Sequence, residues 1–139
     1  MLRAVLDANV YVSAIIHPVG TPGRLVEGFL RAGSFEIVVS PAIVSEVLRA
    51  LAYPKVRKLL RGVDAQVWFE DIVVLADLVA GARQLAGVCD DPDDDKYVAA
   101  AIEGRAAYVV TGDRTFLALK EHAGVEIVTP RAFVDLLGS

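Results

Sequence analysis

Four times in this chain, a residue with a short polar side chain stands directly before a proline at the start of an apolar, helix-like pattern. The four pairs are Thr21-Pro22, Ser40-Pro41, Asp91-Pro92 and Thr129-Pro130. A side-chain oxygen at such a position can accept a hydrogen bond from a free N–H of the first helical turn. Proline suits the first helical position because it has no N–H that needs a partner. The pattern therefore predicts four helix starts spread along the sequence.

Short apolar runs without clear alternation of polar residues lie between these helix starts. They are typical of strands buried on both faces. The predicted strands are residues 2–6, 36–39, 106–110 and 125–128. Strands that alternate with helices indicate a parallel sheet covered on both sides. We therefore expect an α/β fold with three layers (α/β/α) and a central parallel sheet, formed as a single domain over residues 1–139.

Further helices are predicted over residues 10–16, 21–31 and 65–80. Residues 84–86 are a candidate for an additional short strand. The helix at 65–80 carries apolar residues on two sides, including Trp68, Phe69 and Ile72. A second apolar face on one helix suggests a further packing partner, and we expect a homodimer. Residues 55–61 form a short basic segment after the break at Tyr53-Pro54.

Five carboxylates fall within residues 90–95, immediately before an alanine-rich helical pattern. A helix start explains part of this cluster, because acids in the first turn complement the helix dipole. Asp95, however, shares a helical face with Val98, Ala99 and Ile102, the face expected to be buried. An inward carboxylate needs a metal, a cation or strong hydrogen-bond donors to offset its desolvation. The alternative is a solvated acidic helix cap with Asp95 at its rim.

Acids also occur at three other places: Asp7 and Asp113, each directly after a predicted strand, and Glu46 at the edge of a helical apolar stripe. The carboxyl ends of parallel strands meet at one edge of a sheet, where α/β proteins bind ligands. Carboxylates gathered there repel one another unless a cation neutralises them. Oxygen ligands without His or Cys favour Mg²⁺ or Mn²⁺, and such a site suits phosphoryl chemistry. As the alternative, Asp7 and Asn9 cap the following turn.

Composition excludes several other classes of protein. The net charge of −4 counts against a protein that coats nucleic acid, although a metal bound at residues 90–95 would cancel part of that charge. The only cysteine, Cys89, excludes a disulfide framework and a cysteine zinc cluster. His17 and His122 stand outside polar clusters, which argues against histidine-based RNA cleavage. Without a membrane-length apolar run or a signal-peptide pattern, we expect a cytoplasmic protein with no membrane association.

The sequence resembles the PIN-domain family, and within it the VapC-type toxin components of toxin–antitoxin pairs. The resemblance covers essentially the whole chain. It rests on five motifs in a fixed order: Leu6 to Val10, Ser40 to Glu46, Asp91 to Tyr97, Val110 to Arg114 and Ile127 to Phe133. Each motif alone is weak, whereas the five together in this order and spacing are specific.

The resemblance implies a metal-dependent ribonuclease with Mg²⁺ or Mn²⁺ as cofactor, an RNA substrate and a cognate antitoxin as partner. By position, the acids that match the family's catalytic and metal-binding quartet are Asp7, Glu46, Asp95 and Asp113. Asn9 and Thr111 match supporting polar positions of the family, and Asp94, one residue before the matching position of Asp95, is expected to act as a helper. The chain departs from the pattern at Thr115, where similar proteins often carry another acid.

Two other functions compete with this prediction. A non-catalytic PIN-like module that binds RNA or a protein partner would share the fold, although an intact acidic quartet argues against lost chemistry. A haloacid-dehalogenase-like phosphatase also places an Asp after a strand. That chemistry needs a second Asp two residues later, where this chain has Asn9.

Overall fold

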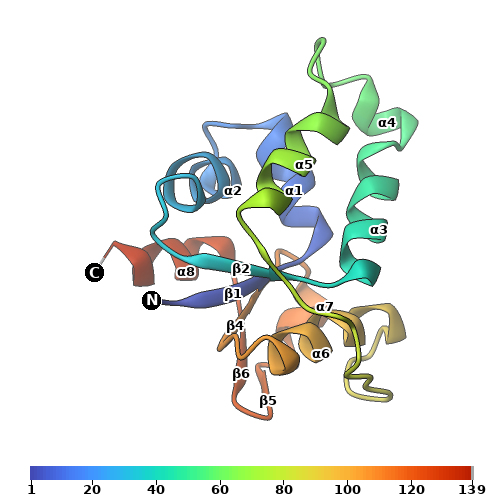
Figure 1. The fold of residues 1–139 in the computed structure, drawn as a ribbon, viewed down its shortest axis with the longest axis vertical. Coiled ribbons are helices and arrows are strands. Elements are labelled where there is room, and N and C mark those ends of the chain that lie inside the picture. The colour runs from blue at the N-terminus through green and yellow to red at the C-terminus, as the bar shows by residue number, and fades with distance from the viewer. Residues whose placement is uncertain (139) are drawn as a thin grey trace.

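A six-stranded sheet forms the centre of the protein in the computed structural model, which describes residues 1–138 (Figure 1). Its strands lie in the spatial order β3-β2-β1-β4-β6-β5. Their bounds are β1 Arg3–Leu6, β2 Glu36–Val39, β3 Asp77–Leu78, β4 Tyr108–Val110, β5 Glu121–His122 and β6 Val125–Val128. The four predicted strands are all present. The α/β fold class with helices on both sides of the sheet is confirmed.

One edge of the sheet departs from the predicted parallel arrangement. Strands β3, β2, β1, β4 and β6 run parallel to their neighbours, but β5 pairs with β6 in the antiparallel direction. The two strands are joined at Ala123 and Gly124, whose φ angles are 52° and 84°. Two consecutive positive φ angles are typical of the tight turns that close a hairpin. The short strand β5 was not predicted from the sequence.

The helices that were predicted from the sequence begin close to their predicted positions, whereas α4 was not predicted. Their bounds are α1 Ala8–Ile16, α2 Thr21–Gly23, a π-helix Arg24–Leu30, α3 Pro41–Leu51, α4 Pro54–Arg57, α5 Ala65–Val74, a 3₁₀ turn Pro92–Asp94, α6 Asp95–Glu103, α7 Arg114–Leu117 and α8 Pro130–Leu137. Side chains of Ser40, Asp91 and Thr129 accept hydrogen bonds from N–H groups of the first turn, as predicted. At the fourth pair the prediction was wrong, because Thr21 is itself the first helical residue and Gly20 precedes it.

The predicted helix over residues 65–80 was too long, and the optional strand at 84–86 is wrong. Helix α5 ends at Val74, and the chain enters the sheet as β3 beside β2. Two contacts hold it there: the Asp77 carboxylate lies 2.5 Å from the guanidinium of Arg3, and the Val79 N–H donates to the carbonyl of Val39 at 2.8 Å. Both partners are distant in sequence, so no local pattern signals the end of the helix.

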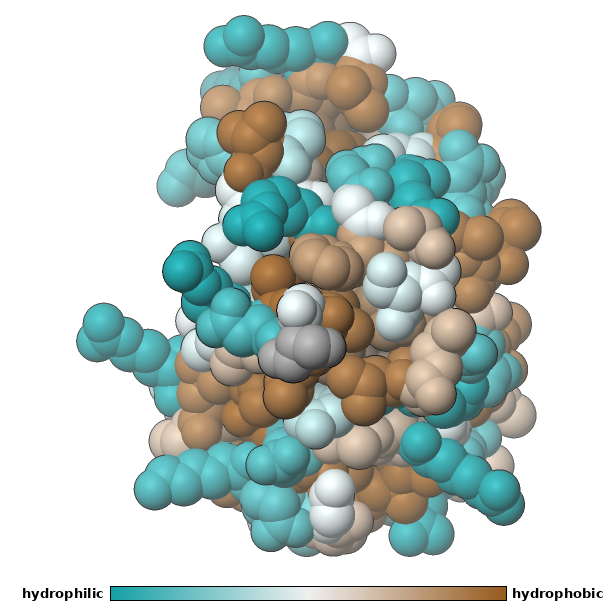
Figure 2. All heavy atoms as spheres, turned by 90° about the vertical axis from the view of Figure 1, so that its left-hand side faces the viewer, coloured by the Kyte–Doolittle hydropathy of each residue, from teal (hydrophilic) through white to brown (hydrophobic). Residues whose placement is uncertain are grey.

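Helices cover both sides of the sheet. Figure 1 shows α1, α2, α3 and α5 on one side and α6 on the other, where it contacts β1, β2, β4 and β6. The alanines of α6 let it approach closely, and a Cβ added at Gly104 would lie 2.5 Å from Cγ1 of Val38. On the face around the two termini, hydrophilic side chains interrupt the hydrophobic surface (Figure 2). No helix within residues 1–138 is long and apolar enough to cross a membrane.

Candidate active site

Asp7 occupies the carboxyl end of β1, where the strand passes directly into α1. Asp7 is only 7% exposed, and its backbone N–H donates to the carbonyl of Val110 in the neighbouring strand β4. Its carboxylate does not cap α1, so both oxygens are available for other contacts. Burial raises the pKa of Asp7, and the negative charge of Glu46 adds to that effect. A buried carboxylate of this kind is stabilised by nearby donors or by a cation.

A hydrogen-bonded network ties Asp7 to the end of β4. Thr111 Oγ1 donates to Asp7 Oδ2 at 2.7 Å, and Asn9 Nδ2 donates to the same oxygen at 3.1 Å. The backbone N–H of Asp113 in turn donates to Thr111 Oγ1 at 3.1 Å. The Asp113 carboxylate caps α7 by accepting from the Thr115 N–H. The structure therefore brings together four of the predicted site residues at one edge of the sheet.

Glu46 reaches this edge from α3 and is held there by two residues of α6. Lys96 forms an ion pair with its Oε2, and the Tyr97 hydroxyl donates to its Oε1. The Tyr97 hydroxyl also accepts a hydrogen bond from the backbone N–H of Ala8 at 3.3 Å. Tyr97 thus links Glu46 to the residue after Asp7, which positions the two acids relative to each other.

Asp94 lies among these acids, at the end of the 3₁₀ turn that precedes α6. It is buried, and its Oδ2 has no hydrogen-bond partner within residues 1–138. Burial raises its pKa to about 7, and nearby carboxylates add to the shift, in decreasing order Asp7, Asp91, Asp113 and Glu46. A buried carboxylate oxygen without a donor is costly. Its presence among other acids indicates a place for a cation.

Asp95 is even less exposed than Asp94, but its Oδ1 accepts a hydrogen bond of 2.7 Å from the backbone N–H of Cys89. It also lines a small cavity shared with Ser40 and Arg83. The inward orientation predicted for Asp95 is present, and the donor that offsets its desolvation is a backbone amide. The geometry thus favours Asp94 as the member of the acidic cluster and Asp95 as the residue that holds the loop before α6. From the sequence we expected Asp95 in the cluster and Asp94 only in a supporting role.

The donor chemistry of the cluster fits a hard divalent cation. Carboxylate oxygens predominate, and the unpartnered oxygen of Asp94 is buried beside them. Within residues 1–138, however, no three acidic, His or Cys side chains are already arranged to hold a metal ion. The Lys96 ammonium instead neutralises Glu46. Asp7, Asp94 and Asp113 are the residues that could hold a metal, and Glu46 could add a fourth carboxylate only if its ion pair with Lys96 were broken.

Sequence reasoning overlooked Lys96 and Tyr97. Both lie in the motif from Asp91 to Tyr97 that carries the family resemblance, and both follow the acids directly. A Lys at the start of a helix is an ordinary surface residue, and a Tyr there is an ordinary core residue, so neither indicates a functional role from the sequence. Their role appears only when α6 is placed against α3. Tyr97 and Glu46, which are in contact there, are 51 residues apart in the sequence.

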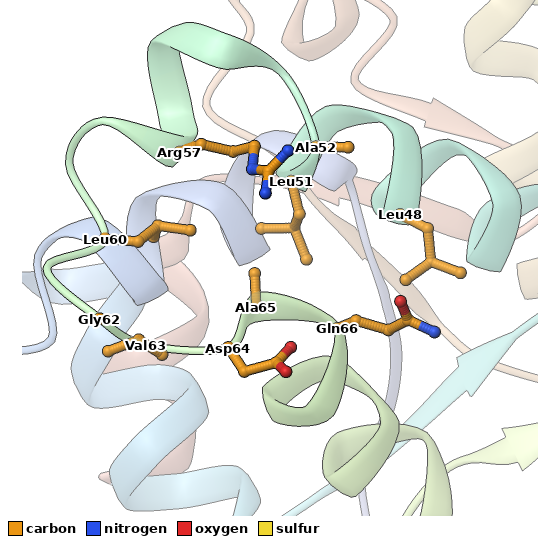
Figure 3. Close-up of a pocket in the computed structure, with 10 residues that line it drawn as sticks. All are labelled: Leu48, Leu51, Ala52, Arg57, Leu60, Gly62, Val63, Asp64, Ala65 and Gln66. Carbon is orange, nitrogen blue, oxygen red and sulfur yellow. The ribbon is translucent and has the colours of Figure 1, made fainter.

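Another cavity, of about 590 Å³, lies between α3, α4 and α5, away from the acidic cluster. Figure 3 shows the Arg57 guanidinium beside Leu51 on one side of this cavity, with Asp64 and Gln66 on the other. Its lining includes none of the predicted site residues. The acids at the sheet edge therefore remain the candidate active site.

Comparison with known proteins identifies relatives of this chain in sequence and in fold. The chain is 25% identical to the uncharacterized protein MJ1680 of Methanocaldococcus jannaschii over 142 residues, which covers 96% of this chain and 90% of that protein. The crystal structure of PAE2754 from Pyrobaculum aerophilum is similar, with a TM-score of 0.59, 15% identity, and coverage of 99% of this chain and 90% of the other.

A second similar structure is that of VapBC2 from Rickettsia felis bound to a DNA fragment from their promoter. The TM-score is 0.59 at 14% identity, with coverage of 92% of this chain and 98% of the other. At these identities the two structures support the fold alone. The family model of the PIN domain matches residues 3–115, a range that includes every acid of the cluster. On that match over most of its length, the chain belongs to the PIN domain family.

Proposed function

We propose that this protein is a metal-dependent endoribonuclease and the toxin component of a toxin–antitoxin pair. The observation that supports it best is the buried Oδ2 of Asp94, which has no hydrogen-bond partner among residues 1–138 and lies near Asp7 and Asp113 at the edge of the sheet. A cluster of carboxylates that lacks enough donors of its own is suited to Mg²⁺ or Mn²⁺. Membership of the PIN domain family is consistent with nuclease chemistry.

In the proposed reaction, water attacks a phosphodiester phosphorus and the bond to the 3′ oxygen of the preceding nucleotide breaks. That oxygen takes up a proton, so the products carry a 3′-hydroxyl and a 5′-phosphate. A divalent ion supplies charge that polarises the phosphate and makes water a better nucleophile near neutral pH.

The protein's own residues hold the groups in place for this reaction. Thr111 and Asn9 orient Asp7 through the two hydrogen bonds to its Oδ2. Tyr97 and Lys96 fix Glu46. Lys96 also lies at this edge of the sheet, and its ammonium would be free to contact a phosphate oxygen of the substrate if a bound cation took its place beside Glu46.

Cleavage of RNA by the purified protein tests the proposal. We expect cleavage in millimolar Mg²⁺ or Mn²⁺, none in chelator, and products with 5′-phosphate ends. Asp7→Asn and Asp94→Asn should each lower the rate by orders of magnitude while circular dichroism stays native. Undiminished cleavage in chelator would contradict the metal mechanism.

A non-catalytic PIN-like module is the second candidate, and the ion pair between Lys96 and Glu46 favours it. A lysine that neutralises an acid of the cluster reduces the need for a metal. In that case the protein would bind RNA or a protein partner without cleaving RNA. Mg²⁺ would then leave the thermal unfolding temperature unchanged.

We also propose a homodimer, with the antitoxin as a further partner. Exposed apolar side chains along α5 and β3 support a partner surface there: Val67, Val74, Leu75 and Leu78 are between 49% and 82% exposed. Light scattering should give the mass of a dimer, and Val74→Asp should shift it toward the monomer. A monomeric wild type at tens of micromolar would contradict the dimer.

A further inference from the structure

A groove of about 500 Å³ opens directly from the acidic cluster between α1 and the end of α3. Asp7 and Glu46 line one part of it, and the rest is mostly apolar, with Val12, Val56 and the ring of Tyr53. Tyr53 is 65% exposed although it is an aromatic residue. An exposed aromatic ring on an apolar wall beside a phosphate-cleaving site is a surface on which a nucleobase can stack.

The chain segment that contributes Tyr53 and Val56 to this groove is basic in sequence, in contrast to the protein as a whole. Between residues 47 and 63 it carries five cations and no acid: Arg49, Lys55, Arg57, Lys58 and Arg61. All five are exposed, and none forms an ion pair with another residue of the described part of the chain. Arg49 is three residues from Glu46 on α3, a spacing that places both on one side of the helix.

We propose that this groove binds the nucleotide next to the cleaved phosphate in a single-stranded RNA, with its base stacked on Tyr53. The flanking phosphates follow Arg49 and Lys55, so that the strand runs from the basic segment to Asp7. This inference rests on the proposed nuclease function and names the substrate class of that same site.

Charge decides between RNA and a protein segment as the occupant of the groove. A protein segment that covered both the groove and the acidic cluster would need cationic side chains beside the cluster. It would also need acidic side chains beside Arg49 and Lys55. RNA supplies a uniform row of phosphates for the basic segment and places one phosphate at the metal site. A base also needs to leave its duplex partner to reach Tyr53, which restricts the substrate to unpaired nucleotides.

Binding of a short, fluorescently labelled oligoribonucleotide in chelator tests the proposal without cleavage. Tyr53→Ala should weaken binding of the single strand about 5- to 100-fold. Tyr53→Phe keeps the ring and should bind like the wild type. Binding to a perfect duplex of the same sequence should be weaker and should not depend on Tyr53.

The basic segment has a matched control in Lys120, an exposed lysine on the loop before β5. Lys55→Ala should lower the slope of log affinity against log salt by about 0.7, because one phosphate contact is lost. Lys120→Ala makes the same change in charge and should leave the slope unaltered. Equal slopes for the two variants would overturn the proposed path of the strand.

Cleavage of the same oligonucleotide in Mg²⁺ is scored separately, so that the two proposals can fail independently. Cleavage that Asp7→Asn abolishes, together with wild-type binding by Tyr53→Ala, overturns the groove proposal alone. Binding that depends on Tyr53 without any cleavage overturns the nuclease function and leaves an RNA-binding groove. A wild type that binds duplex as well as single strand also overturns the groove proposal.

Discussion

Thr111 donates a hydrogen bond of 2.7 Å to Oδ2 of Asp7, across 104 residues of sequence and between two neighbouring parallel strands. The threonine is fully buried, and its hydroxyl oxygen also accepts from the N–H of Asp113. One hydroxyl therefore sets the orientation of the acid after β1 and the position of the acid after β4. In metal sites, loss of such a supporting contact typically lowers metal affinity or activity about 10- to 100-fold.

Replacing Thr111 tests this contact. Thr111→Val preserves the shape of the side chain but removes the hydroxyl, so Asp7 loses a donor. We expect Mg²⁺-dependent cleavage to fall about 10- to 100-fold. Thr111→Ser retains the hydroxyl and should keep most of the activity. Equal losses in the two variants would show that packing of the methyl group, rather than the hydrogen bond, matters.

Asp94 and Asp95 are adjacent acids for which we predict opposite effects of neutralisation. Asp94→Asn relieves repulsion among buried carboxylates and should raise the free energy of unfolding in chelator by about 1 kcal/mol. Asp95→Asn weakens the charge-assisted hydrogen bond from the Cys89 N–H and should lower the free energy of unfolding by about 1 kcal/mol. Thermal or denaturant unfolding of both variants in chelator measures the signs.

Mg²⁺ separates the two acids further, because a ligand that binds only the folded state raises its stability. Millimolar Mg²⁺ should stabilise the wild type and Asp95→Asn, and should stabilise Asp94→Asn much less. If Asp95→Asn instead loses the response to Mg²⁺ and Asp94→Asn keeps it, Asp95 belongs to the metal site.

The Lys96 ammonium pairs with Oε2 of Glu46, and we therefore expect it to compete with a metal for that carboxylate. In Lys96→Met the carboxylate is released, and the acidic cluster gains one uncompensated charge. We expect lower stability in chelator than for the wild type, and a larger gain in unfolding temperature on addition of Mg²⁺. A gain in Lys96→Met no larger than in the wild type would mean that Glu46 does not contribute to metal binding.

Gly104 permits the close packing of α6 on the sheet, and its replacement tests that layer of the fold. A Cβ at this position would lie 2.5 Å from Cγ1 of Val38, too close for both to remain in place. Gly104→Ala should cost about 1–3 kcal/mol of unfolding free energy. At Gly28 an added Cβ meets no atom within 4 Å, so Gly28→Ala should be neutral or slightly stabilising. Urea denaturation of the two variants provides the comparison.

The sequence by itself determined most of the strands and helix starts, because the signals are local. The bounds of β2 and β6 are the predicted ones, and Ser40, Asp91 and Thr129 cap helices as predicted. A cap depends on residues within one helical turn, and a buried strand shows in a few consecutive apolar residues.

The sequence also determined that Asp7, Asn9, Thr111 and Asp113 lie together. This follows from a general property of parallel sheets, whose strands end at the same edge. Only the approximate positions of the two strands were needed, and small errors in the bounds did not matter. The hydrogen bonds among these four residues match that expectation.

Tertiary structure alone decided where α5 ends and which hydrogen bonds the adjacent acids Asp94 and Asp95 make. The end of α5 depends on Arg3, 74 residues from Asp77. The roles of Asp94 and Asp95 depend on a 3₁₀ turn and on the backbone N–H of Cys89, a donor that every non-proline residue possesses. Adjacent identical side chains carry no sequence signal that distinguishes them, so the direction of each carboxylate is set by the loop and helices packed around it.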